Sequence, residues 1–95
     1  MKKIAKYVSP LRVDAKVFIR TVTHYYTGIV RLLSTEEIVL GDAAWIFDTG
    51  RFSQAMATGT LSEVEPYPDG VLVSVSRGGV VDVAEWKHEL PRSVR

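Results

Sequence analysis

Short runs of β-branched and aromatic residues recur along the chain, and each run ends at polar or glycine-containing residues. Runs of this length and composition are typical of strands. The pattern predicts strands over residues 17–23, 29–33, 37–40, 43–47, 71–76 and 80–84. Residues 24–28 form a turn or the start of the second strand, and Gly41-Asp42 makes a bend. Residues 77–79 are a tight turn that joins the last two strands into a hairpin.

One short helix is predicted between the fourth and fifth strands. Its apolar stripe, at i, i+3 and i+4, consists of Phe52, Ala55 and Met56. Asp48 or Thr49 can cap its first turn, because a side-chain oxygen satisfies free backbone amides, and Gly59 ends it. Residues 60–69 contain two prolines, so we expect an extended or irregular connection there.

These elements predict an α+β, mainly β fold. We expect a small bent antiparallel sheet or an SH3/Sm-like barrel of five to six strands with one short helix. A chain of 95 residues fits a single domain over 1–95, with a basic N-terminal arm at 1–12 and a polar C-terminal tail at 87–95. A core of this size leaves little stability in reserve and there is no cysteine for disulfides, so homo-oligomerisation is expected.

The charge balance narrows the possible partners. Twelve basic residues against eleven acidic ones give a net charge of +1, which makes a nucleic-acid partner unlikely, because duplex binders usually carry a strong basic excess. No apolar run approaches the roughly 20 residues that span a bilayer, so no membrane partner is expected. The absence of cysteine fits a reducing compartment, and we expect a cytoplasmic protein.

The sequence carries no recognisable catalytic arrangement. His24 and His88 lie far apart and neither belongs to a known motif. No nucleophile elbow, phosphate-binding loop or zinc-protease motif occurs. We therefore expect no enzyme activity, no catalytic residue, no metal site and no cofactor.

Aromatic rings beside arginines point instead to binding. Three ring residues follow Arg20 within one turn, and Arg51 stands next to Phe52 soon after Trp45 and Phe47. Flat rings stack on nucleobases, and guanidinium groups hold phosphates through two hydrogen bonds. The candidate ligand-binding residues are Arg20 and Arg51 for phosphates, Tyr25, Tyr26 and Phe52 for stacking, and Thr23 and His24 for polar contacts. The alternative is that these rings are core or interface residues.

Residues 17–46 resemble half of an Sm-like domain. The resemblance rests on Tyr26-Thr27-Gly28-Ile29-Val30, followed by a polar turn and Ile38-Val39-Leu40-Gly41-Asp42-Ala43. It implies a bent five-stranded barrel that assembles into rings and binds single-stranded nucleic acid. Residues 35–37 stand where that family has its RNA-contacting asparagine.

A longer resemblance covers residues 6–84. It rests on Ile19-Arg20-Thr21, residues 23–28, residues 38–43, Trp45 and residues 51–59. These features are similar to small phage-encoded anti-defence proteins of the anti-Thoeris type, although Ala44-Trp45 replaces the usual paired arginines. The resemblance implies a non-catalytic sponge in the host cytoplasm that sequesters a nucleotide second messenger, of the cyclic ADP-ribose type or a cyclic oligonucleotide. A structural or interaction protein that inhibits a host protein is the third possibility.

Overall fold

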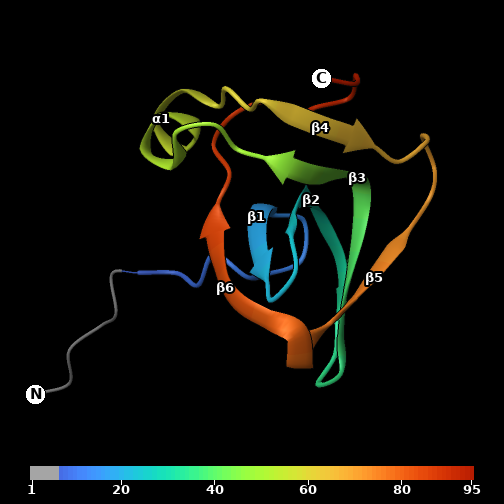
Figure 1. The fold of residues 1–95 in the computed structure, drawn as a ribbon. Coiled ribbons are helices and arrows are strands. Elements are labelled where there is room, and N and C mark those ends of the chain that lie inside the picture. The colour runs from blue at the N-terminus through green and yellow to red at the C-terminus, as the bar shows by residue number, and fades with distance from the viewer. Residues whose placement is uncertain (1–6) are drawn as a thin grey trace, which may run out of the picture.

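One strongly bent antiparallel sheet forms the body of the described chain, with the helix α1 at one end (Figure 1). This computed structural model describes residues 7–95, so residues 1–6 of the predicted N-terminal arm lie outside the described residues. The elements are β1 (Lys16–Thr21), β2 (Tyr25–Leu33), β3 (Glu37–Asp48), α1 (Phe52–Thr58), β4 (Glu63–Pro66), β5 (Val73–Ser76), the 3-10 turn η1 (Arg77–Gly79) and β6 (Val80–Glu85). The predicted mainly β class, with five to six strands and one short helix, is confirmed.

The strand order is β4-β3-β2-β1-β6, and β5 also pairs with β3. Strand β3 can serve two partners because it bends at Gly41-Asp42, as predicted, without ending there. Asp42 has a left-handed backbone, with φ 47°, and the register against β2 shifts at this point. Gly28 lies opposite the bend, where a Cβ atom would come within 3.1 Å of the Leu40 Cβ. The first half of β3 therefore pairs with β5 and the second half with β4.

Alternate residues of each strand point to opposite faces of the bent sheet. Both faces carry apolar side chains, and these form two core clusters. Core cluster 1, inside the bend, contains Val17, Ile19, Val30, Ile38, Leu40, Ala43 and Val75. Core cluster 2, between the other face, α1 and the C-terminal segment, contains Phe18, Ala44, Ile46, Ala55, Leu61, Val64 and Trp86. At its centre, Phe18 stacks on Tyr25 and Trp86, at centroid distances of 5.4 and 5.7 Å.

Two local predictions about the strands are wrong. Residues 37–40 and 43–47 belong to one strand rather than two. The stretch 60–69, expected to be extended or irregular, contains the extended strand β4, which pairs with β3. The last two strands do not form a hairpin: β5 pairs with β3, β6 pairs with β1, and η1 leads from one to the other. In each case a partner distant in the sequence decides the pairing.

The helix α1 begins later than its predicted caps. Its N-cap position is Arg51, which makes no capping hydrogen bond, while the Asp48 carboxylate accepts from the Gly50 backbone N–H at 2.7 Å. The predicted cap at Asp48 or Thr49 is therefore wrong. The predicted stop is confirmed, since Gly59 is left-handed, with φ 78°, and its N–H donates to Ala55. Ala55 is the buried residue of the helix.

The segment predicted as a polar tail, residues 87–95, lies against the rest of the molecule. The main chain of Arg95 exchanges two hydrogen bonds with Val64 of β4, both 3.0 Å long. His88 is held through both its main chain and its side chain. Its carbonyl accepts a hydrogen bond from Lys16 Nζ at 2.6 Å, and its ring Nε2 lies 2.8 Å from the Met56 carbonyl oxygen. This segment covers the outer edge of β4 and one side of core cluster 2 (Figure 1).

We expect Phe18→Ala to lower the free energy of unfolding by about 3–5 kcal/mol, because the ring is buried and its removal leaves a cavity. Phe47→Ala is the matched control, since that ring is 50% exposed and its loss should cost less than about 1 kcal/mol. Urea unfolding of both variants checks this. Equal losses would show that core cluster 2 does not depend on Phe18.

Candidate functional site

The seven predicted ligand-binding residues fall on both faces of the sheet. Tyr25 and Tyr26 are neighbours in β2, so their rings point in opposite directions. Tyr25 lies in the aromatic group around Phe18, which also meets Phe52 of α1 at 6.1 Å. Tyr26 lies on the other face against His24, at 4.7 Å. Within one chain, the structure therefore does not bring all the predicted stacking rings together.

Arg20 shares the face of Tyr25, and its guanidinium is already occupied. Its Nε lies 3.1 and 3.0 Å from the two carboxylate oxygens of Asp82, and one terminal nitrogen lies 2.6 Å from Oδ2. This hydrogen-bonded pair lowers the pKa of Asp82 and raises the pKa of Arg20. A phosphate would have to displace a two-pronged partner. Arg51 is exposed at the N-terminal end of α1.

On the opposite face, four rings meet at one end of the sheet. This Trp45 ring cluster consists of His24, Tyr26, Trp45 and Phe47. Trp45 lies 4.6 Å from His24 and 4.6 Å from Phe47, between ring centroids. Trp45 is paired with Tyr26 across β3 and β2, and Phe47 is half exposed. The residues missed as site candidates, Trp45 and Phe47, share a face because they are two apart in a strand.

The polar atoms of the Trp45 ring cluster are incompletely satisfied. His24 Nδ1 lies 2.7 Å from Thr23 Oγ1, whereas the buried Nε2 has no hydrogen-bond partner among residues 7–95. Burial lowers the pKa of His24 and so favours its neutral ring. Trp45 Nε1 is likewise buried without a hydrogen-bond partner among residues 7–95. Burial raises the pKa of Tyr26, and Trp45 partly counters that rise. A ligand with a polar edge would supply the hydrogen bonds that these buried nitrogen atoms lack.

A cleft of about 290 Å³ opens beside this cluster. It is lined by Trp45, Glu65, Pro66, Tyr67 and Pro68. Glu65 stands opposite Trp45 in the pairing of β3 with β4. Tyr67 adds to the raised pKa of Tyr26, and both rings pack against core cluster 1. The cleft thus combines flat rings, two prolines and one carboxylate, and its size suits a single planar ring system.

An arginine from the C-terminal segment reaches the backbone of this cleft. Arg92 donates to the carbonyl oxygens of Ala43 and Tyr67, at 3.0 and 2.8 Å, and to the Asp69 carboxylate at 2.7 Å. Sequence reasoning missed Arg92 because only the docking of residues 87–95 brings it to Tyr67. No local pattern near position 92 signals that contact.

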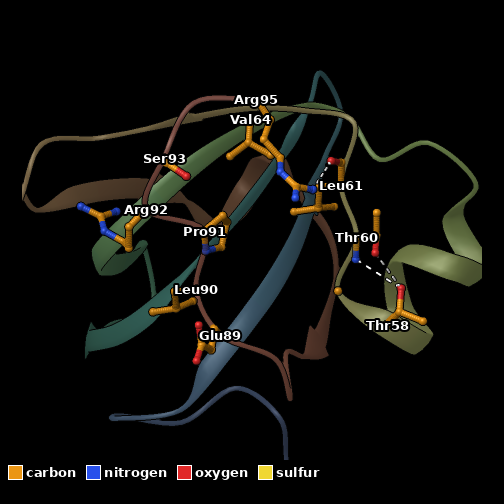
Figure 2. A pocket seen from close by; sticks show the side chains of 11 residues that line it. Thr58, Thr60, Leu61, Val64, Glu89, Leu90, Pro91, Arg92, Ser93 and Arg95 are labelled. Carbon is orange, nitrogen blue, oxygen red and sulfur yellow. Dashed lines mark hydrogen bonds between the residues drawn. The ribbon is translucent and has the colours of Figure 1, made fainter.

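A larger cavity, of about 600 Å³, lies between the end of α1, the start of β4 and the C-terminal segment (Figure 2). In Figure 2 the Arg95 side chain reaches toward Leu61, whose carbonyl accepts from it at 3.0 Å. The hydroxyls of Thr58 and Thr60 bond to each other at 3.0 Å. No aromatic ring lines this cavity, and these polar groups are paired within the fold, so it suits a flat ligand less well than the cleft at Trp45.

Residues 7–95 contain no group of three or more His, Asp or Glu side chains placed to hold a metal ion. In the same part of the chain, no helix has the length and apolar character needed to cross a bilayer. Comparisons with protein-family models, with curated proteins and with solved structures gave no match. The arrangement of the rings and charges therefore carries the functional argument.

We expect the free energy of unfolding to fall as the pH drops from about 7 through the folded pKa of His24. The folded pKa lies below the ordinary 6.5, so the unfolded chain takes up a proton that the folded protein resists. His24→Gln should lose this part of the pH dependence, and His88→Gln should keep it. Urea titrations between about pH 5 and 7.5 measure the difference. Identical profiles for wild type and His24→Gln would contradict it.

Proposed function

We propose that this protein is a non-catalytic binding protein that captures a nucleotide-type messenger by stacking its base on the Trp45 ring cluster. The observation that supports this most is the meeting of partly exposed rings beside a cleft of about 290 Å³. Bases stack on aromatic side chains without regard to sequence, because every base has a flat π-face. Thr23, His24 and Tyr26 of the predicted set belong to this site or adjoin it.

The energetics favour a ligand with more than one base, or a site shared by two chains. Stacking contributes about 1–3 kcal/mol per base. Nanomolar capture needs about −12 kcal/mol, which one stacked base does not supply. A cyclic oligonucleotide held between the ring clusters of two protomers doubles the stacking surface. The proposal therefore includes a homo-oligomer, and Phe47, which is 50% exposed, is available for contact with the second chain.

Stoichiometric capture gives the protein the role of a sponge. A bound messenger is withheld from its receptor, and no bond of the messenger changes. In this proposal the protein acts in the cytoplasm, where such messengers work, and serves a phage-type anti-defence function. Arg20 is paired with Asp82 on the other face of the sheet, and Arg51 is exposed before α1, so the proposal assigns neither a contact with the base.

A second candidate function is inhibition of a host protein through a protein contact. It is favoured by exposed apolar side chains around β5 and β6, namely Leu72, which is 63% exposed, and Val81, which is 56% exposed. This function predicts no small-molecule binding. An Sm-like ring on single strands is a third, and it predicts an affinity that falls steeply with salt.

A capture experiment tests the proposed function. The purified protein is incubated with cyclic diguanylate, cyclic triadenylate and cyclic ADP-ribose isomers, then separated from free ligand and denatured by heat. We expect one of these ligands to be depleted and then released intact. Release of an altered product would identify an enzyme instead. Depletion of none of them would refute nucleotide capture.

We expect Trp45→Ala to weaken binding of the captured ligand by about 5- to 150-fold, the equivalent of one lost stacking contact. Isothermal titration calorimetry measures the affinity, and circular dichroism confirms the fold. Tyr7→Ala is the matched control, because Tyr7 is a 92% exposed ring that is not part of the Trp45 ring cluster, and its loss should leave binding unchanged. A loss with Phe52→Ala but none with Trp45→Ala would place the ligand on the opposite face.

A further inference from the structure

We infer that Arg92 binds a phosphate of the captured ligand, and that the Asp69 carboxylate holds that position in the free protein. This inference rests on the proposed function. It assigns the charged end of the ligand to a residue of the C-terminal segment rather than to Arg20 or Arg51.

The guanidinium of Arg92 is fixed in place before any ligand arrives. One terminal nitrogen donates to the Ala43 carbonyl at 3.0 Å, and the other donates to the Tyr67 carbonyl at 2.8 Å. These two bonds join β3, the end of β4 and the C-terminal segment. The charge is thereby held beside Tyr67, which lines the cleft. An arginine ordered in this way loses little side-chain entropy when an oxyanion binds.

The remaining partner of Arg92 is easily displaced. Asp69 contributes one contact of 2.7 Å, and its side chain is 93% exposed, against 29% for Arg92. Exposed ion pairs of this kind contribute about 1 kcal/mol or less. Asp69 lies in an exposed turn before Gly70, which has φ +84° and no atom within 4 Å of its Cβ position. The Asp69 carboxylate thus occupies a position beside Arg92 that the phosphate of a ligand can take in its place.

The other arginine–aspartate pair is a poorer exchange site. Arg20 and Asp82 face each other across β1 and β6, and three short contacts join them. Both strands hold this carboxylate in register, so no loop movement can withdraw it. A phosphate competing for Arg20 meets a fixed negative charge, whereas a phosphate competing for Arg92 meets a side chain on a turn.

The charges at and beside the cleft give the ligand a direction. Glu65 lines the cleft opposite Trp45, whereas Arg92 lines the larger cavity and meets the cleft through the Tyr67 carbonyl, to which it donates at 2.8 Å. Positions 65 and 67 are two residues apart in an extended chain, which is about 7 Å. Glu65 accepts hydrogen bonds from the N–H groups of a base, while its charge turns phosphates away. The base therefore lies at Trp45, with its phosphate toward Arg92.

The test compares the two arginine–aspartate pairs by removing each carboxylate in turn. Asp69→Asn and Asp82→Asn are titrated calorimetrically with cyclic diguanylate, cyclic triadenylate or cyclic ADP-ribose, whichever the wild type binds most tightly. We expect Asp69→Asn to tighten binding by about three- to fivefold, because the carboxylate no longer competes with the phosphate for Arg92. This factor corresponds to the energy of one exposed ion pair. Asp82→Asn should leave binding within twofold of wild type, as should Asp69→Asn toward the corresponding uncharged nucleoside.

Each other outcome has a distinct meaning. Tighter binding by Asp82→Asn alone would place the phosphate at Arg20 and overturn the inference, while capture itself would stand. No change in either variant, with wild-type binding intact, would likewise overturn it. If the wild type binds none of the three ligands, the proposed function itself is wrong. Circular dichroism of both variants, whose substituted side chains are exposed, verifies that they fold.

Discussion

The bend of β3 at Gly41-Asp42 is the constraint on which the rest of the structure depends. One strand that changes direction can pair with β5 before the bend and with β4 after it. The left-handed Asp42 and the missing side chain at Gly28 permit the close approach of β2 at this point. Because the sheet folds over, a chain of 95 residues builds two small core clusters instead of one. The Trp45 ring cluster lies beyond the bend, where the second half of β3 pairs with β2.

The elements that were predictable are those encoded by neighbours in the sequence. The β-branched residues of β1, the glycine that ends α1 and the bend in β3 each follow from local backbone preference. Strand β4 was missed because Glu63–Pro66 is short, charged and ends in proline, so only its pairing with β3 makes it a strand. The predicted final hairpin failed because η1 separates β5 from β6 and each pairs elsewhere. Long-range pairing has no signal within a short window of sequence.

The candidate site shows the same limit. His24, Tyr25 and Tyr26 are adjacent in sequence, but strand alternation places Tyr25 against core cluster 2 and Tyr26 on the other face. That separation follows from strand alternation, so period-two reasoning could have placed Tyr25 and Tyr26 on opposite faces, whereas the pairing of Tyr26 with Trp45 is set by the register of β2 and β3. Arg92 differs, because its place depends on how residues 87–95 dock, and docking is a tertiary event. Charges at the ends of chains are therefore poorly assigned by pattern alone.

The two tryptophan side chains lie in different environments. Trp86 is 2% exposed in core cluster 2, where its Nε1 donates to the Glu89 carbonyl, whereas Trp45 borders the open cleft. Their emission spectra should therefore differ, with Trp86 reporting the integrity of the packed interior and Trp45 the solvent and quenchers at the cleft. In a variant that retains only Trp86, tryptophan fluorescence would report unfolding. In a variant that retains only Trp45, it would report whether the cleft is occupied.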